Sequence, residues 1–308
     1  MKVHINVSIV IVNWNGTDVL PKCFESICQN LLGFEYEVIV VDNVSTDGSR
    51  EWLQSEEVTN RFPPGRLKVI LSDQNIGFAR ANNLAIEYAV GEMIFLLNPD
   101  TVLQPGAIKR LSDVLASSKS VGAVAPKLLN ADGSLQPSIS DFSSNPISII
   151  CRAMNLTKRH DHSVLGPVPV FWGTAILAKR SVIEQIGAFD PAFFMYGEDV
   201  EWCVRMNRRG WQTVFVPDAE VVHLGGKSSE QAWKESETAL RKDAADILVQ
   251  KKCLPRYLVR LNSLTKAGLY SLAYLKRWLT QQPRDFLCNH IRLQMSLGED
   301  FRETTDPS

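Results

Sequence analysis

The sequence lacks the features that mark several common classes of protein. Its six cysteines form no CxxC pair, and no cysteine and histidine cluster has the spacing of a zinc site. A reduced, cytosolic compartment is therefore the simplest expectation. The first apolar run, Val7–Val12, is too short for a signal peptide or a membrane span. Low-complexity segments and internal repeats are also lacking, so fibrous and solenoid architectures are excluded.

An excess of charge of either sign is lacking too. The net charge is −1 over 308 residues, so no global field recruits nucleic acid, and none is expected as a partner. Hydrophobic residues make up 45% of the chain and charged residues 22%, which is too apolar for a disordered protein. This length allows one large α/β domain with a C-terminal addition.

The first 130 residues alternate between strand and helix patterns. Continuous β-branched runs predict parallel strands that are covered on both faces. The expected strands are Val7–Val12, Glu37–Val41, Leu67–Leu71, Met93–Leu97 and Val121–Ala125. The expected helices are one capped by Asp18, then Gly77–Ala89 and Pro105–Ser117. This rhythm predicts an α/β fold with a doubly wound, mostly parallel sheet.

The following hundred residues are less regular. Ser138–Pro169 mixes Ser, Pro, His and basic residues with little periodicity, which predicts a long surface loop or lid. The elements expected around it are a strand at Val170–Ala178, a helix at Glu198–Arg209 and a short strand at Val214–Val216.

Polar clusters follow the predicted strands at the points where the strands end. They are Asn13-Trp14-Asn15-Gly16, Asp42-Asn43 and Asn98-Pro99-Asp100. In doubly wound sheets, ligands bind outside the carboxyl ends of the strands. The sequence therefore predicts a binding site at this edge of the sheet.

Several of these side chains suit a nucleotide. Asp42 can accept a hydrogen bond from a pyrimidine N3–H, amides can bind base or ribose, and Arg80 can pair with phosphate. The candidate residues are Asn13, Asn15, Asp42, Asn75, Arg80 and Asn82. A plain turn followed by a helix cap also explains the stretch Asp42–Ser49, so both interpretations stay open.

Further candidates suit a diphosphate and acid–base chemistry. Asp100 offers a hard oxygen to a divalent cation, although a β-turn explains the Asn-Pro-Asp spacing equally well. Glu198 and Asp199 open a predicted helix, where one can act as a general base or both can be ordinary helix-start charge. His223 precedes a Gly-rich turn that suits a diphosphate, although a lone histidine is usually structural.

In their order along the chain, these segments resemble the family-2 glycosyltransferases of the GT-A fold, particularly the bacterial rhamnosyltransferase-like branch. The matching segments are Ser8–Gly16, Asp42–Ser49, Asn75–Phe78 with Ala81–Asn83, Leu97–Asp100, Gly187–Asp190, Phe193–Asp199, and His223 with Gly225. The resemblance spans roughly residues 5–228. It implies a GT-A domain over 1–228, with a nucleotide-binding half (1–127) and an acceptor half (128–228). A helical region would follow at 229–308.

The resemblance also implies an activity. A sugar would pass with inversion from a nucleoside diphosphate to a hydroxyl of a glycan or lipid-linked acceptor, in cell-surface polysaccharide assembly. The donor would be a dTDP- or UDP-sugar, and dTDP-rhamnose is the hypothesis that rests on the branch.

Two alternative classes of protein are disfavoured by the sequence. A sugar nucleotidyltransferase is disfavoured because no Gly-rich loop with Arg and Lys follows the first strand. A non-catalytic glycan- or partner-binding protein is disfavoured by the acid pair at 198–199 together with Asp100.

The same resemblance implies roles for individual residues. Asp42 would recognise the base, and Asp199 would be the catalytic base. Asp100 would hold Mg²⁺ or Mn²⁺, and His223 would bind the diphosphate or the metal. The pair Trp172-Gly173 would shape the floor beside the donor sugar. Asn98 departs from the family, whose metal motif often begins with Asp, but the branch commonly shows Asn-Pro-Asp.

The C-terminal region combines leucine periodicity with one sign of charge. From Ile247 to Arg284 there is no acidic residue. Leucines at helical spacing from Leu254 to Leu279 share one face, while Lys252, Arg256, Lys266 and Arg277 lie opposite. Residues 250–284 are predicted to lie on an anionic membrane, at the inner face of the cytoplasmic membrane. Docking on the catalytic domain or on a second subunit, as in a homodimer, is the alternative.

Overall fold

The computed structural model describes residues 5–31, 33–142, 144–157, 160–225, 235–280 and 285–296. It divides into two compact units. The sheet unit comprises residues 1–140, 161–194 and 198–228, and the helical unit comprises 141–160, 195–197 and 229–308. The main division falls at residue 228, the boundary expected between catalytic and C-terminal regions, but the helical unit also takes in two inner segments.

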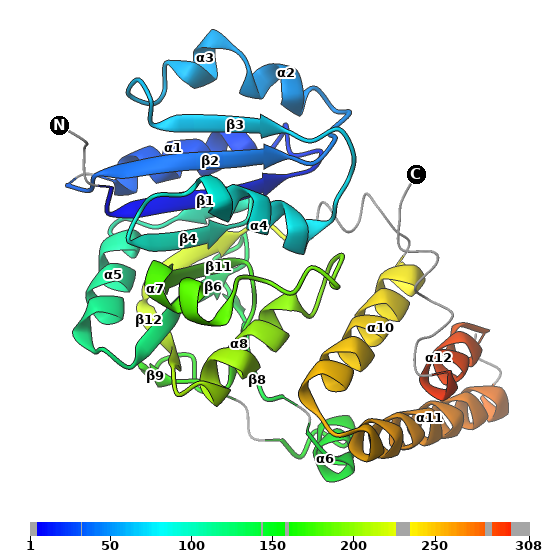
Figure 1. Cartoon of the computed structure of the whole chain (residues 1–308). Coiled ribbons are helices and arrows are strands. Elements are labelled where there is room, and N and C mark those ends of the chain that lie inside the picture. Colours follow the sequence, from blue (N-terminus) through cyan, green and yellow to red (C-terminus); the bar gives the residue numbers. More distant parts are fainter. Residues whose placement is uncertain are drawn as a thin grey trace. The chain divides into compact units, whose positions relative to one another are not determined.

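The sheet unit is built on a long sheet in the order β3-β2-β1-β4-β11-β6-β12-β5. Its first four strands are mutually parallel (Figure 1). They are β1 Val7–Asn13, β2 Tyr36–Asp42, β3 Leu67–Leu71 and β4 Met93–Leu97. The expected strands of the first half are thus confirmed, each beginning or ending within one residue of its predicted bounds. Their carboxyl ends meet at one edge of the sheet.

The second half of the sheet is mixed rather than mostly parallel. β11 (Ala175–Lys179) runs antiparallel between β4 and β6 (Val121–Leu129). β12 (Gln212–His223) is parallel to β6 and antiparallel to β5 (Thr101–Leu103). The short strands are β7 Leu135–Gln136, β8 Ile139–Ser140, β9 Gly166–Pro167 and β10 Val170–Phe171. β8 and β10 pair with each other as a separate two-stranded sheet.

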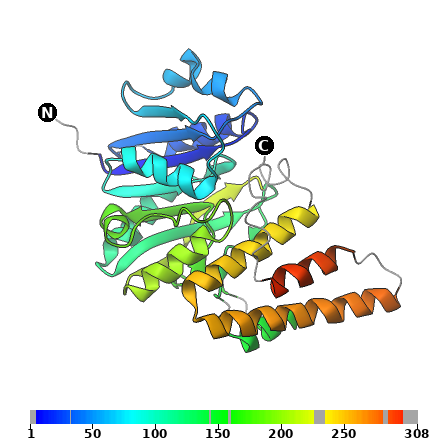
Figure 2. The same cartoon turned by 45° about the vertical axis from the view of Figure 1, so that its right-hand side comes forward.

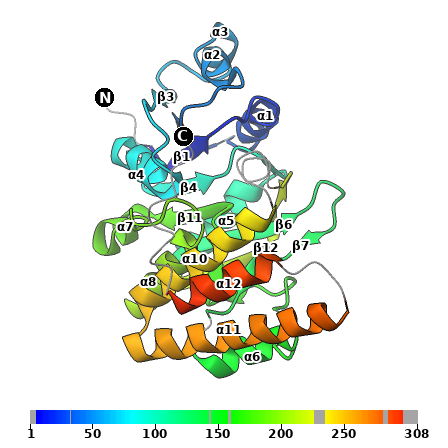
Figure 3. The same ribbon diagram turned by 90° about the vertical axis from the view of Figure 1, so that its right-hand side faces the viewer.

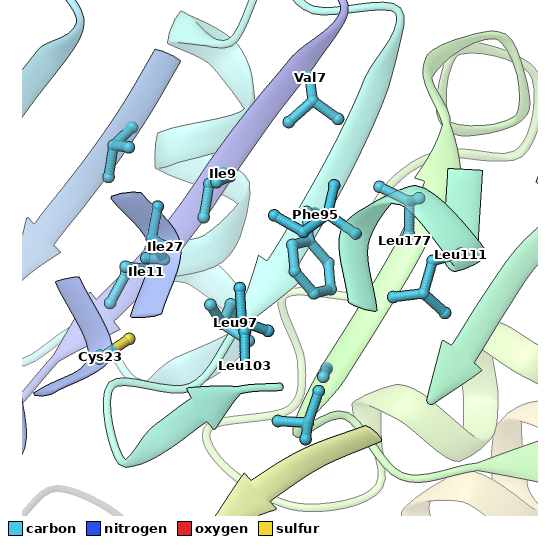
Figure 4. Close-up of a cluster of buried hydrophobic side chains, with 14 of the residues drawn as sticks. Val7, Ile9, Ile11, Cys23, Ile27, Phe95, Leu97, Leu103, Leu111 and Leu177 are labelled. Atoms are coloured by element: carbon cyan, nitrogen blue, oxygen red, sulfur yellow. The ribbon is translucent and has the colours of Figure 1, made fainter. Parts of the chain in front are cut away.

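Helices cover both faces of the parallel strands. Those of the sheet unit are α1 Leu20–Asn30, α2 Ser49–Leu53, α3 Glu56–Thr59, α4 Phe78–Tyr88, α5 Ala107–Ser117, α7 Arg180–Ile186 and α8 Glu198–Arg208. Figure 3 shows α1 and α4 on opposite sides of β1. Alternate residues of β1, including Ile9 and Ile11, enter an apolar core with side chains of α1 and α5 (Figure 4). This is the doubly wound arrangement expected from the sequence.

Three sequence predictions are wrong in detail. The strand expected over Val170–Ala178 is broken at residues 172–174, because their backbone groups bond outside the ladder. The short strand at Val214–Val216 is part of the much longer β12, which bulges between Val216 and Glu220. Asp18 does not cap α1, whose N-cap is Val19 without a side-chain hydrogen bond.

The segment Ser138–Pro169, expected to be a loop or lid, contains regular elements. It includes β8, β9 and the helix α6 (Pro146–Ala153). Asn145 caps α6 by accepting a hydrogen bond from the Ser148 amide at 3.0 Å, and Pro146 fits the first turn. The Asn-Pro pair is therefore a helix start, a signal that the general irregularity of the segment obscures.

The helical unit contains α6, α10 (Glu235–Cys253), α11 (Arg256–Leu279) and α12 (Asp285–Met295). Figure 2 shows α11 running beside α12, with α6 at its N-terminal half. Among the helices of the described residues, none is both long enough and apolar enough to cross a membrane.

Candidate active site

The first part of the candidate site lies where β1 and β2 end. Asn13 and Asp42 are aligned partners of these strands, and both are fully buried. The Asn13 amide donates to Asp42 Oδ2 at 2.9 Å and to Ser45 Oγ at 3.0 Å. Asp42 Oδ1 accepts from the Ser45 backbone N–H at 3.0 Å, and Arg50 Nε lies 3.5 Å from it. Asp42 therefore shapes the loop after β2, and its recognition of a pyrimidine base stays a prediction.

The loop after β2 is held in an uncommon backbone conformation. Val44 has φ +67°, a left-handed conformation that is strained for a β-branched side chain. Asn15, with φ +53°, accepts a hydrogen bond from the Thr46 N–H at 2.7 Å. A Cβ at Gly16 would lie 2.3 Å from Asn13 Oδ1, so only glycine fits there. The first polar cluster of the sequence and the Asp42 loop thus form one rigid structure.

A second loop joins this structure to the start of α4. Asn75 Oδ1 accepts from the Asn43 amide at 2.6 Å and from the Gly77 N–H at 3.1 Å. Gly77 has φ +80°, and a Cβ there would lie 2.6 Å from the Phe194 carbonyl oxygen. Asn75 is therefore brought beside the Asp42 loop, as expected for one binding edge. Asn43, which the sequence did not single out, makes the connection.

The other two nucleotide candidates lie along α4 and bond elsewhere. Arg80 Nε donates to the Pro191 carbonyl at 3.0 Å, and its side chain is otherwise exposed. Asn82 is buried and donates to the Phe78 carbonyl at 2.9 Å. Their contacts with phosphate or ribose stay predictions.

The candidate metal ligands Asp100 and His223 do meet in space. The pairing of β5 with β12 places Thr101 opposite His223, and the Leu224 N–H donates to the Asp100 carbonyl at 2.9 Å. As a result, Asp100 Oδ2 lies 3.3 Å from His223 Nε2. His223 Nδ1 lies 2.7 Å from Gln136 Oε1 on β7. In the tautomer that has its proton on Nδ1, this nitrogen donates to the Gln136 oxygen and Nε2 turns its lone pair toward Asp100.

Two lone pairs that face each other in this way fit a proton or a cation between them. No group of three or more His, Cys, Asp or Glu residues converges within the described part of the chain. A cation here would therefore take two ligands from the protein and the rest from phosphate and water, as Mg²⁺ usually does in proteins. Asn98 Oδ1 is also buried without a hydrogen-bond partner among the described residues, so the site has a further polar oxygen to satisfy. The residues fit a divalent cation.

The candidate catalytic acids open α8. Asp199 Oδ2 accepts from the Gly173 N–H at 2.7 Å, and Oδ1 accepts from the Val200 N–H at 2.7 Å. Burial raises the pKa of Asp199, and the hydrogen bonds from these backbone groups oppose it. Burial, with the charge of Asp199 beside it, raises the pKa of Glu198 to about 8. Because Asp199 accepts two backbone hydrogen bonds and Glu198 Oε2 is buried without a hydrogen-bond partner among the described residues, Asp199 is the better placed of the two to carry a negative charge.

A backbone segment connects this base to the metal candidates. The Asn98 N–H donates to the Thr174 carbonyl at 2.9 Å, and the neighbouring Gly173 N–H binds Asp199. A Cβ at Gly173 would lie 3.3 Å from Asp199 Cβ, so the two segments are in close contact. Trp172, the preceding residue, is 45% exposed and available to a ligand. The break in the expected strand is thus part of the site.

The segment after α7, which the resemblance singled out, is held by hydrogen bonds from two helices. Arg205 pairs with Glu201 at 2.7 Å and donates to the carbonyls of Gly187 and Ala188 at 3.2 and 2.8 Å. Asn83 of α4 exchanges two hydrogen bonds with the backbone of Phe189. The Gly187–Asp190 segment is therefore clamped between α8 and α4, which fixes the start of α8 and its two acids.

The mixed sheet, with polar side chains where its parallel strands end, fits the GT-A class of glycosyltransferases. The family model described as glycosyl transferase family 2 matches residues 8–187, and the chain belongs to this family. Membership disfavours the nucleotidyltransferase alternative.

Individual proteins are similar over most of the sheet unit. The chain is 31% identical over 219 residues to the N-acetylglucosaminyl-diphospho-decaprenol L-rhamnosyltransferase of Mycobacterium tuberculosis, covering 60% of this chain and 66% of that protein. The match therefore spans just under two thirds of that relative. The rhamnosyltransferase WbbL of Escherichia coli K12 is 25% identical over 233 residues, covering 70% and 83%. The crystal structure of GalNAc-T7 with UDP, GalNAc and Mn²⁺ has a TM-score of 0.65 at 16% identity, covering 100% of this chain and 59% of that one. It supports the fold.

Proposed function

We propose that this protein is an inverting glycosyltransferase that transfers a sugar from a nucleoside diphosphate to a hydroxyl of a glycan or lipid-linked acceptor. The observation that carries the proposal is the backbone connection from Asn98 through Thr174 and Gly173 to Asp199. It connects, through one continuous piece of backbone, the residue proposed as the base with the segment that carries the proposed cation ligand Asp100. Single-displacement transfer needs these two groups around one bound donor.

Each residue has a role in that reaction. Asp199 accepts the proton of the acceptor hydroxyl as its oxygen attacks the anomeric carbon, and the bond to the diphosphate breaks with its electron pair moving to the phosphate oxygen. Neutral Glu198 stays beside Asp199 without adding a second negative charge. Asp100 and His223 would hold Mg²⁺ or Mn²⁺, which would neutralise the charge of the departing diphosphate. Gln136 orients the His223 ring through its Nδ1–H.

The donor would be a dTDP- or UDP-sugar, with dTDP-rhamnose as the specific hypothesis. Two similar proteins are named rhamnosyltransferases, and one of those names describes a sugar carried on a diphospho-decaprenol lipid. On this chain, Asn13, Asn15, Asp42 and Asn75 form one connected loop structure that would receive the base and ribose. Trp172 and Gly173 would border the donor sugar. A lipid-linked acceptor would place the protein in the cytoplasm, at the inner face of the cytoplasmic membrane.

Calorimetric titration of the full chain with a panel of nucleotide sugars tests the donor. With Mn²⁺ present, dTDP-rhamnose and UDP-sugars should bind more tightly than GDP- or CDP-sugars, and chelation of the metal should weaken them. Tighter binding of guanosine or cytidine donors would overturn the pyrimidine assignment. Transfer to a polyprenyl-diphosphate-linked sugar, with inversion read by NMR, tests the reaction itself. Release of pyrophosphate from a nucleoside triphosphate and a sugar phosphate would point to nucleotidyl transfer instead.

A further inference from the structure

The outward side of α11 carries a continuous apolar stripe. Its side chains recur every three or four residues, and all are substantially exposed. This outer face consists of Tyr257, Leu261, Leu264, Gly268, Leu272, Leu275 and Leu279. At about 100° per residue, these positions fall within a sector of about 80° on the helix surface. Exposed leucines in such a row are not the scattered apolar residues of an ordinary surface.

The inward side of the same helix carries polar residues as well as the buried Val259 and Ala267. Buried Asn262 donates to Gln250 at 2.9 Å, and the Tyr270 hydroxyl donates to Asp243 at 2.7 Å. Lys266 forms an ion pair with Asp246 on the same side. Lys266, which the sequence pattern assigned to the basic membrane-binding set, is therefore occupied inside the unit. A helix with its polar residues inside and its leucines outside is the reverse of the arrangement that water favours.

The charges around the outer face have one sign. α11 contains no acidic residue, and Arg256, Arg260 and Lys276 are exposed on it. Arg256 and Arg260 lie in the first two turns, where the helix dipole disfavours a cation. This placement does not stabilise the isolated helix. It does allow both arginines to interact with an external anionic surface.

The neighbouring helix α6 extends the apolar surface. α6 packs against α11, and Figures 2 and 3 show it on the side of α11 away from α12. Its exposed side chains and those just after it are Ile147, Ile150, Met154 and Leu156. Its one charged residue is the basic Arg152, so α6 also lacks acidic residues. The two helices share the same combination of apolar and positive groups.

We infer that the outer face of α11, together with α6, docks on an anionic lipid bilayer, with α11 lying in the plane of the headgroups. Leucines would enter the acyl boundary, and the arginine and lysine ends would reach the lipid phosphates. A second copy of the chain fits this face poorly, because two such helices would oppose only positive groups in either orientation. The inference is independent of the sugar-transfer reaction, since it concerns only residues of the helical unit.

Vesicle co-sedimentation of the full chain provides the test. We compare vesicles of phosphatidylcholine alone with vesicles that also contain phosphatidylglycerol, using the unchanged protein, Leu264→Gln with Leu272→Gln, and Arg256→Gln with Arg260→Gln. The matched control is Val90→Gln with Leu135→Gln, which changes two exposed apolar residues of the sheet unit. All replaced side chains are exposed, so circular dichroism and thermal unfolding should be unchanged and will verify folding.

The unchanged protein should bind the anionic vesicles preferentially. The leucine variant should lose about tenfold or more in partitioning, and the arginine variant should lose most of the preference for anionic lipid. The control should bind like the unchanged protein. Equal binding by the leucine variant and the control would overturn the inference. So would light scattering that shows a dimer which the leucine variant converts to a monomer, because the outer face would then be a subunit interface.

Discussion

The two units of the molecule place their buried polar groups in opposite ways. The sheet unit has an apolar interior around Phe95 and Leu177 (Figure 4), and several buried polar side chains, among them Asn13, Asp42 and Asn43, lie where its parallel strands end. The helical unit has buried polar groups through its interior and leucines on the outside of α11. In both units apolar surface avoids water. In the sheet unit it does so inside the protein, whereas the leucines of α11 would do so in the proposed lipid bilayer. Buried polar contacts join helices in one unit, and a polar rim is the candidate active site of the other.

The change that most sharply tests the polar rim of the sheet unit is Asp199→Asn. The amide cannot accept the acceptor proton, so kcat should fall by about a thousandfold, while donor affinity should be retained. Turnover and calorimetric donor binding measure the two effects separately. The control Glu184→Gln removes an exposed carboxylate from α7 and should leave both unchanged. Full turnover in Asp199→Asn would remove Asp199 from the mechanism.

The corresponding change in the helical unit is Asp243→Asn. Asp243 accepts from Tyr270 at 2.7 Å and lies 2.6 Å from His290 Nδ1, with Lys266 at 3.9 Å. Removing one member of a buried charged network should reduce the free energy of unfolding by about 3 kcal/mol. Denaturant unfolding, with hydrogen exchange of the amides in α10 to α12, measures this loss.

The matched control is Glu237→Gln, which removes a half-exposed partner of Arg241 on the same helix. Because Glu237 is 44% exposed to water, its pair with Arg241 should contribute about 1 kcal/mol or less. Equal losses for Asp243→Asn and Glu237→Gln would mean that the polar interior does not hold the helices together.

Gln136→Ala sharpens the assignment of the rim to cation binding. Without the Gln136 oxygen, the His223 ring loses the partner that fixes its orientation. Loss of such a supporting contact typically weakens metal binding by about tenfold or more. The Mn²⁺ concentration needed for donor binding should rise accordingly. The control is Gln212→Ala, which changes an exposed glutamine of β12 and should leave the required Mn²⁺ concentration unchanged. An unaltered Mn²⁺ requirement in Gln136→Ala would contradict the assignment.

The smallest effect concerns the protonation of Glu198. Its pKa is raised from 4.5 to about 8 on folding, because burial and Asp199 disfavour the charge. A raised pKa stabilises the folded protein below the unfolded pKa, and this stability is lost as pH rises through the folded pKa. At pH 9, the free energy of unfolding of Glu198→Gln should therefore exceed that of the unchanged protein by about 1 kcal/mol or more. Thermal unfolding measured between pH 5 and pH 9 should show a flatter profile for the variant, and parallel profiles would contradict a neutral Glu198.

Much of the sheet unit could be predicted from sequence because its signals are local. The β-branched runs of β1 and β2 and the polar residues directly after them place Asn13 and Asp42 at one edge. The break at residues 172–174 could not be predicted, because its backbone bonds go to Ser138, Asp199 and Asn98, far away in the chain. Gln136 carried no signal either, since it reaches His223 only through the pairing of β7 with β6.

In the helical unit, the sequence predicted the leucine face but not the inner one. Leucine spacing is local, so the stripe from Leu261 to Leu279 was visible. The partners of Asn262 and Lys266 are residues of a different helix, and their pairing depends on how the helices pack. The basic set of the sequence pattern therefore included one lysine that serves the interior.

The contact between Gly173 and Asp199 uses a main-chain N–H, which every amino acid except proline possesses. The position of Asp199 at this contact therefore does not depend on which side chains stand at positions 172 and 174. Exchange of the exposed Trp172, proposed to border the donor sugar, would leave the contact in place. The side chain proposed to select the sugar and the atom that positions Asp199 are therefore separate, and one can change without the other.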